Sequence, residues 1–205
     1  MLRSVLICQD CGSKRSQSEP FFSLSLPLSK EIQLARQKMT VERCLQHFTL
    51  PETLADPVAC PACSKKTVTK KQHVISKLPK VLCLHLKRFD AAHNRKIEDY
   101  VGFPTEGMNM GHHLPHWSEV TMTTPPPLPK ELQTVEESMG SEPIVLYDLF
   151  STVNHFGNLQ SGHYITNVKV KKQWYHINDA HVGFATEAEV QKSDGAYLLF
   201  YHRRS

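Results

Sequence analysis

Two Cys-x-x-Cys pairs, Cys8-x-x-Cys11 and Cys60-Pro-Ala-Cys63, constrain this chain more than any other feature of its sequence. Both thiolates of such a pair can face one tetrahedral ion at about 2.3 Å, so two pairs supply a complete set of four ligands. Gly12, directly after the first pair, is a turn former that helps the backbone fold round a metal. We therefore predict one structural zinc site, which draws together two pairs separated by 48 residues.

Two other uses of paired cysteines are open from the residues alone. A thioredoxin-like redox pair belongs beside a βαβ pattern, which this sequence lacks. Disulfides need an oxidising compartment, and because nothing in the chain points to one, we expect an intracellular protein. The remaining cysteines, Cys44 and Cys83, lie in apolar runs, where burial raises a thiol pKa and favours core packing over nucleophilic chemistry.

Alternating apolar residues predict an α+β fold that is rich in strands and poor in helices. The strand-like runs are 22–28, 72–79, 80–89, 144–155, 163–170, 173–179 and 196–202. Residues 30–50 have helical spacing, and Thr40 occupies an N-cap position within them. Pro, Ser, Thr and Glu are frequent in 104–143, so we expect a surface insertion there. Three histidines of that segment could bind a metal, but they have no acidic partners beside them.

The composition is that of a globular domain, with 40% apolar and 21% charged residues. No apolar run approaches the roughly 18 residues that a membrane span requires. The net charge of +4 is modest, although basic residues cluster at 65–71 and 169–172. Solvated hairpin tips explain these clusters better than a nucleic-acid interface, so we do not expect direct nucleic-acid binding.

The segments SGHYITN (161–167) and QWYHIND (173–179) together predict a base and its orienting partner. His163 begins one strand, and a hairpin register brings Asn178 on the next strand back beside it. An acceptor at that place would hold the imidazole Nδ1–H and leave Nε2 free to take a proton from a thiol or hydroxyl. From these residues alone, an ordinary surface histidine remains an alternative.

Taken in order, the motifs resemble the C-terminal part of the catalytic domain of ubiquitin-specific proteases. The resemblance rests on the two cysteine pairs, then KLPKVLCLHLKRF, YVGFP, SGHY, WYHIND and a closing AYLLFYH, and it covers nearly the whole chain. It implies the papain-like hand fold of that family, with zinc at the tip of the fingers. The implied division is fingers at 1–78, palm at 79–103 and 144–205, and a variable insertion at 104–143.

The same resemblance implies a role for each candidate site residue. His163 matches the general base, Asn178 the orienting third member, and Asp179 a second polar residue near the catalytic centre. The implied reaction is thiol-dependent hydrolysis of the bond after the C-terminal glycine of ubiquitin. The loop NHFGNLQSGHY and the tail AYLLFYH further resemble the member that works in the histone-deubiquitinating module of the SAGA co-activator. That similarity implies a nuclear protein whose partners are ubiquitin, a ubiquitinated histone and the subunits of the module.

One family motif has no counterpart in the printed sequence. The nucleophilic cysteine of the family lies in a GNTCYMN-like segment of the thumb, and neither Cys44 nor Cys83 has such neighbours. We therefore expect fingers and palm without the thumb, as a fragment or as a chain that is inactive alone, with an apolar palm face left uncovered. The alternatives are a non-catalytic ubiquitin-binding scaffold and, less favoured, a zinc-dependent nucleic-acid or chromatin binder.

Overall fold

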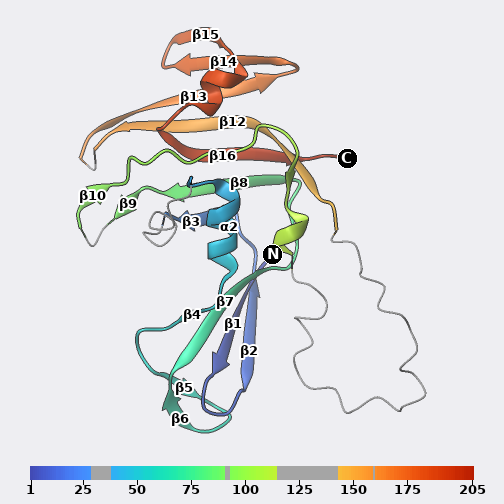
Figure 1. Ribbon diagram of the computed structural model, residues 1–205, viewed down its shortest axis with the longest axis vertical. Coiled ribbons are helices and arrows are strands. Elements are labelled where there is room, and N and C mark those ends of the chain that lie inside the picture. Colours follow the sequence, from blue (N-terminus) through green and yellow to red (C-terminus); the bar gives the residue numbers. More distant parts are fainter. Residues whose placement is uncertain (29–37, 91–92, 115–142, 159) are drawn as a thin grey trace.

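The computed structural model describes residues 1–28, 38–90, 93–114, 143–158 and 160–205. Two sheets dominate these residues, one of eight strands and one of four. In Figure 1 the eight-stranded sheet lies across the upper half and the four-stranded sheet extends below it, with the N-terminus near their junction. Strands far outnumber helices in the described ranges, so the predicted α+β class is confirmed.

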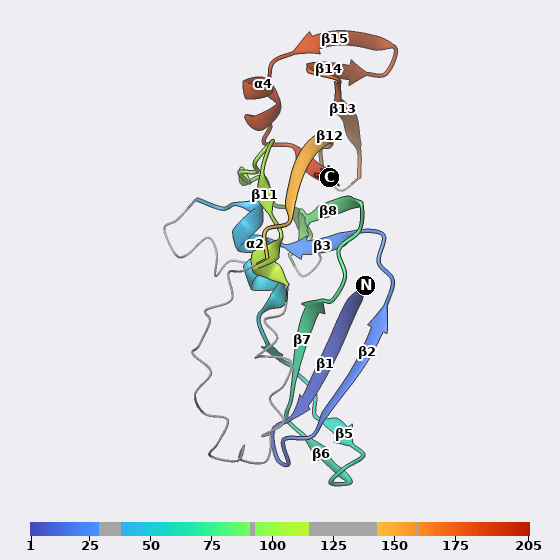
Figure 2. The same ribbon diagram turned by 90° about the vertical axis from the view of Figure 1, so that its right-hand side faces the viewer.

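The four-stranded sheet has the order β2-β1-β7-β4, and all of its pairs are antiparallel. A separate hairpin of β5 and β6 lies at its far end (Figure 2). We call these strands together the fingers: β1 (Leu2–Cys8), β2 (Lys14–Glu19), β4 (Glu52–Thr53), β5 (Val58–Cys60), β6 (Lys65–Thr67) and β7 (Thr69–Ile75). In the β1–β7 register Leu2 pairs with Ile75 near the eight-stranded sheet, and Cys8 pairs with Thr69 at the opposite end.

The eight-stranded sheet, which we call the palm sheet, has the order β15-β14-β13-β12-β16-β8-β3, with β11 beside β12. Its β3–β8 pair is parallel and its other pairs are antiparallel. A short hairpin of β9 (Phe89–Asp90) and β10 (Arg95–Lys96) continues from β8. The strands of the palm sheet are β3 (Leu24–Pro27), β8 (Val81–Lys87), β11 (Met108–Asn109), β12 (Leu146–Gly157), β13 (Gly162–Val170), β14 (Gln173–Asn178), β15 (His181–Ala185) and β16 (Ala196–Arg203).

The two α-helices of the described residues lie on the same side of the palm sheet (Figure 2). The first, α2 (Val41–Thr49), begins after Thr40, whose side chain accepts a hydrogen bond from the Arg43 backbone as the sequence predicted. The second, α4 (Glu187–Gln191), starts with a complete capping box. A 3-10 turn, η1, spans Gly111–His113. The predicted helical residues 30–37 lie outside the described ranges, and no described helix is long and apolar enough to cross a membrane.

The core lies between the palm sheet and α2. Leu82, Leu84 and Leu86 alternate along β8 and are fully buried, as two-residue periodicity requires of a sheet face that packs on a helix. β3 contributes its own alternating leucines to this layer, although the sequence division assigned residues 24–27 to the fingers. Phe22 departs from the predicted alternation, because it precedes β3 and is 97% exposed.

The predicted surface insertion begins too early. Thr105, Met108 and Met110 are buried, and β11 pairs with β12 in the palm sheet. Tyr201 also donates a hydrogen bond to the Pro104 carbonyl at 2.8 Å. Residues 104–114 therefore belong to the packed palm, because their two methionines supply apolar surface to its core. The remainder, 115–142, lies outside the described residues.

The opposite face of the palm sheet carries apolar side chains that no described helix covers. Register places Tyr164, Val182, Leu198 and Phe200 on this face, since each alternates with residues that face α2 or α4. Tyr164 is 52% exposed and Val182 is 65% exposed. Such a surface is typical of an interface with another segment or protein.

Candidate functional site

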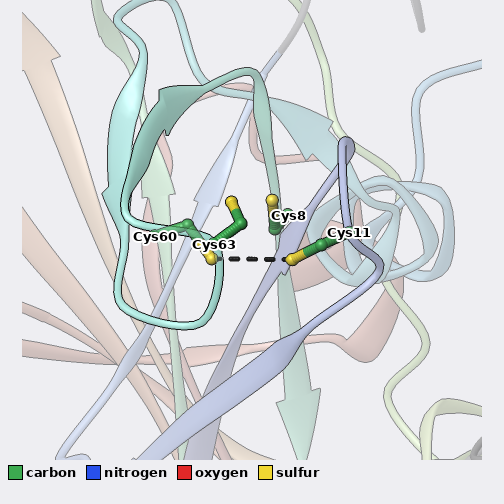
Figure 3. A group of neighbouring side chains, drawn as sticks. All are labelled: Cys8, Cys11, Cys60 and Cys63. Carbon is green, nitrogen blue, oxygen red and sulfur yellow. Dashed lines mark hydrogen bonds between the residues drawn. The ribbon is translucent and has the colours of Figure 1, made fainter.

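The two cysteine pairs meet at the tip of the fingers (Figure 3). Cys8 ends β1 and Cys11 lies on the β1–β2 connection, while Cys60 ends β5 and Cys63 lies on the turn to β6. Their four sulfur atoms all lie within 4.8 Å of one another. Strand pairing brings this about, because Cys8 lies beside Thr69, the first residue of β7, which follows directly after the β5–β6 hairpin.

The two connections have the same local backbone. The amide of Gly12 donates to the Cys8 carbonyl at 3.0 Å, and the amide of Ser64 donates to the Cys60 carbonyl at 2.8 Å. Gly12 and Ser64 both adopt left-handed conformations, with φ of 71° and 56°. Each pair is therefore folded into one tight turn that directs both sulfurs to the same side.

The geometry of the four sulfurs fits a structural zinc ion. Zn–S bonds of about 2.3 Å in a tetrahedron place neighbouring sulfurs about 3.8 Å apart. The sulfurs of Cys11 and Cys60 are 3.7 Å apart. Four protein ligands close the coordination sphere, so zinc here would join the two turns and leave no position for a substrate.

Ionisation of the cluster also suits a cation. A hydrogen bond with the Thr67 side chain, followed by the Cys11 backbone, lowers the pKa of Cys8 to about 6. At Cys11, the hydrogen bond from the Ser13 backbone lowers the pKa of the thiol, but the neighbouring cysteines and burial together raise that pKa to about 12. Four thiolates this close together repel one another, so a metal ion that neutralises their charge would stabilise the cluster.

The second candidate site lies at the opposite end of the molecule, where β13 and β14 begin and end. His163 Nε2 lies 2.6 Å from Asn178 Oδ1. The hairpin brings them together through the pairs Val170–Gln173 and Thr166–Ile177, with the turn residue Lys171 at a φ of 56°. His163 is exposed and Asn178 is half-buried, so the imidazole is accessible from solvent.

The structure changes one detail of the predicted pair. Nε2, and not Nδ1, faces Asn178, and a carbonyl oxygen can only accept a hydrogen bond. Nε2 therefore carries the proton, and Nδ1 is the nitrogen left with a lone pair for proton exchange. Hairpin register determines which two residues meet, but the ring orientation depends on side-chain torsions that a register argument does not determine.

Asp179 follows Asn178 in the tight turn between β14 and β15. Its φ of 52° is left-handed, a conformation that Asp and Asn adopt more readily than other side chains. The residue is exposed, and no hydrogen bond to His163 is formed by the described Asp179 side chain. The turn places Asp179 next to the pair without making it part of the hydrogen bond.

The strand that leads to His163 is held by contacts the sequence did not reveal. The Lys96 ammonium donates to the carbonyls of His155 and Gly157 at 2.9 and 3.0 Å. Gly162 lies directly over the buried His155 ring, so that a Cβ at Gly162 would lie 2.0 Å from His155 Nε2. From the sequence, Lys96 and Gly162 are only a polar and a small residue, and these contacts could not be predicted because the partners lie up to 61 positions apart.

Neither remaining cysteine serves this site. Cys44 is fully buried on α2, where burial raises the pKa of its thiol to about 11. Cys83 faces the other side of β8, and burial raises its pKa as well. Within the described residues, the hydrogen bond that His163 makes is the one to Asn178. The predicted core-filling role holds for Cys44, and Cys83 is partly buried.

The hydrogen-bonded imidazole at the end of the palm sheet and the four-cysteine cluster at the tip of the fingers are the two features from which the sequence predicted the ubiquitin-specific protease family. A family model for "Ubiquitin carboxyl-terminal hydrolase" matches residues 1–201. The chain therefore belongs to the ubiquitin carboxyl-terminal hydrolase family, and the predicted resemblance is confirmed.

Curated relatives support this membership across the whole chain. Mouse ubiquitin carboxyl-terminal hydrolase 51 is 35% identical over 222 residues, which cover 99% of this chain and 32% of that protein. Human ubiquitin carboxyl-terminal hydrolase 3 is 34% identical, with 98% and 37% covered. Human ubiquitin carboxyl-terminal hydrolase 22 is 34% identical, with 99% and 41% covered. The chain thus spans 32% to 41% of the length of these relatives.

Solved structures give the same result for the fold. The yeast SAGA DUB module matches with a TM-score of 0.76 and 32% identity, covering 100% of this chain and 40% of the matched chain. A SAGA DUB module of Ubp8, Sgf11, Sus1 and Sgf73 bound to monoubiquitin matches with a TM-score of 0.74 and 31% identity, with 100% and 40% covered. The hand fold predicted from the motifs is therefore confirmed.

Proposed function

We propose that this chain is the fingers and palm of a deubiquitinase that hydrolyses the bond after the C-terminal glycine of ubiquitin. The observation that carries the proposal is the exposed His163–Asn178 pair, with 2.6 Å between Nε2 and Oδ1, in a chain of this hydrolase family. The nucleophilic thiol would come from a segment outside the printed residues, on the side of His163 Nδ1.

The chemistry follows from the protonation state of the ring. A thiol within about 3 Å of Nδ1 gives its proton to that nitrogen and attacks the glycine carbonyl carbon as a thiolate. The imidazolium then protonates the leaving lysine amine, which leaves the glycine carbonyl as a thioester. A water molecule, deprotonated by the same nitrogen, attacks that carbonyl; the C–S bond breaks, the glycine carboxylate is released, and the thiolate takes its proton back from the imidazolium. Asn178 keeps the proton on Nε2 and fixes the ring plane, without the charge stabilisation that a carboxylate would add.

The narrower part of the proposal concerns substrate and location. Matches to SAGA DUB modules, one of them bound to monoubiquitin, support ubiquitin as the ligand of the fingers and palm. They also favour a nuclear protein that acts on a ubiquitinated histone beside the subunits of such a module. Asp179 would contribute a second polar group next to Asn178, since the two are adjacent in the β14–β15 turn.

The test uses the native protein, recovered from cells with an antibody to its C-terminal segment. We expect an intact mass above 23.3 kDa and a covalent adduct with a thiol-reactive ubiquitin probe. His163→Ala should abolish ubiquitin hydrolysis while ubiquitin binding remains, and His202→Ala, at the far end of β16, should change neither. Full hydrolysis by the His163→Ala protein would refute the assigned base.

A non-catalytic ubiquitin-binding scaffold is the second candidate. It is favoured by the positions of Cys44 and Cys83, because neither lies against His163 and the printed sequence contains no other unassigned thiol. This function predicts that a native protein of 23.3 kDa binds ubiquitin without reacting with the probe. Absence of ubiquitin binding up to about millimolar concentration would exclude it.

A further inference from the structure

A cleft of about 490 Å³ opens on the face of the palm sheet that carries His163 and Asn178. β12, β13 and β14 form its floor, and α4 with the turn that follows it forms one wall. In Figure 2, α4 lies beside these strands at the end of the sheet remote from the fingers. The volume of the cleft is within the range of sites that bind small ligands or a few residues of peptide.

The floor is a buried chain of hydrogen bonds. Ser193 donates to Asn154 Oδ1 at 2.8 Å, and the Asn154 amide donates to Thr152 Oγ1 at 3.3 Å. The Asn167 amide donates to the same hydroxyl oxygen at 3.1 Å. Thr152 and Asn154 are fully buried and Asn167 is 5% exposed, so the floor has a fixed geometry before any ligand arrives.

This hydrogen-bond network ends at a histidine that faces the cleft. His176 Nδ1 lies 2.9 Å from Asn167 Oδ1, and because that oxygen only accepts, Nδ1 carries the proton. In the neutral ring, Nε2 of His176 is therefore a hydrogen-bond acceptor. β13 and β14 thus carry two His–Asn pairs, one at the exposed end of the hairpin and one lining the cleft.

The walls combine acceptors with apolar surface. Glu189 and Asp194 carry two negative charges, against one positive charge on Lys192. Phe156 and Ile165 supply apolar contacts. A ligand that matches this lining has an alkyl stem and a cationic head that donates hydrogen bonds, as lysine and arginine side chains do.

The cleft begins next to the His163–Asn178 pair. Phe156 is the register partner of His163, and Ile165 lies two residues further along the same face of β13. Side chains two residues apart on one strand are separated by about 7 Å. A peptide chain attached to the reacting bond could reach the cleft within two or three residues.

We propose that this cleft is a subsite for a basic segment of the ubiquitinated partner, on the side of the leaving lysine. The assignment rests on the proposed deubiquitinase function, and it narrows the substrate class to lysines flanked by other basic residues. Excess negative charge and the accepting Nε2 of His176 would select such segments against acidic ones.

Binding can be measured on the 205-residue chain by NMR, without any need for a nucleophile. The probes are a lysine-rich decapeptide and a matched glutamate-rich decapeptide. We expect the lysine-rich peptide to shift the resonances of His176 and Asp194, and the glutamate-rich peptide to leave them unchanged. A lysine-rich peptide that shifts only finger resonances, or none, would overturn the proposal.

Two variants with opposite expected effects separate charge from damage to the fold. Asp194→Asn should weaken binding, and Lys192→Glu should tighten it, each by about two- to fivefold, the range of one exposed ion pair. Glu19→Gln, an exposed acidic position on β2 in the fingers, should have no effect and serves as the control. An equal loss in Glu19→Gln, or weaker binding in Lys192→Glu, would contradict the assignment.

Ubiquitin itself is titrated in parallel, so that failure of the two proposals can be distinguished. Loss of the deubiquitinase proposal would appear as absent ubiquitin binding by this chain and absent probe labelling of the native protein recovered from cells. Loss of the cleft proposal would appear as normal ubiquitin binding with no selective response to the lysine-rich peptide. Competition between ubiquitin and that peptide for the same resonances would assign the cleft to ubiquitin and also refute a leaving-side subsite.

Discussion

Substitution of Gly162 by Ala tests how the strand carrying the candidate base is held in place. A Cβ at this position would lie 2.0 Å from His155 Nε2 and 2.8 Å from the Phe156 carbonyl oxygen. Real Cβ contacts require more than 3 Å, so the His155 ring or the β13 backbone must move by about an ångström or more.

The His155 ring has little room to move. It is 4% exposed, and its ring centroid lies 4.7 Å from that of Tyr164 and 5.7 Å from that of Phe89. Each aromatic contact contributes about 0.5–1.5 kcal/mol, and overpacking in a tight core typically costs about 1–3 kcal/mol. The smaller chain entropy of an unfolded alanine offsets about 0.4–1 kcal/mol of this loss.

We therefore expect Gly162→Ala to lower the free energy of unfolding by about 1–3 kcal/mol, measured by urea denaturation. At this chain length the melting temperature should fall by about 2–4 °C for each kcal/mol. Gly183→Ala is the matched control, because nothing lies within 4 Å of its added Cβ. Equal stability of the Gly162→Ala and Gly183→Ala proteins would refute the close contact with His155.

Three other predictions follow from groups elsewhere in the chain. Removal of zinc by a chelator, or the substitution Cys11→Ser, should unfold the fingers and lower the melting temperature. Structural zinc supplies about 10 kcal/mol or more of binding free energy in small domains. An unchanged melting curve together with no bound zinc would refute the cluster assignment. Burial lowers the pKa of His113 and of His155, so the unfolded state takes up protons first as the pH falls. The free energy of unfolding should therefore decline below about pH 6.5, by at most about 1.4 kcal/mol per pH unit for each histidine. A free energy of unfolding that rose in urea titrations from pH 7 to 5 would contradict this prediction. Arg88 is buried and donates hydrogen bonds to the carbonyls of Ala196, Ile97 and Asp99 at 2.6, 3.0 and 2.9 Å. Arg88→Met should therefore lower the free energy of unfolding by about 3–5 kcal/mol. A decrease below about 1 kcal/mol would show that these carbonyls find other donors.

The parts of the site that could be predicted from sequence are those set by short-range geometry. Two thiols three residues apart meet one ion because a single turn brings them to the same side, so the cysteine spacing was sufficient to predict the cluster. His163 and Asn178 meet because a short hairpin connects them, with 15 positions between donor and acceptor. The N-cap at Thr40 and the alternating leucines of β8 are local in the same sense.

Other features were decided by contacts between residues that are distant in sequence. The orientation of the His163 ring, the burial of residues 104–114 and the Lys96 contacts with β12 depend on which side chains are present across the sheet. The cleft exists only because α4 packs beside strands that include β12, which ends 30 residues before α4 begins. Sequence periodicity specifies which face of an element is apolar, but not which other element will cover that face. The sequence by itself therefore determined the four-cysteine cluster, the His–Asn pair and the fold class, whereas the tertiary structure decided the proton position on the imidazole and the surface next to it.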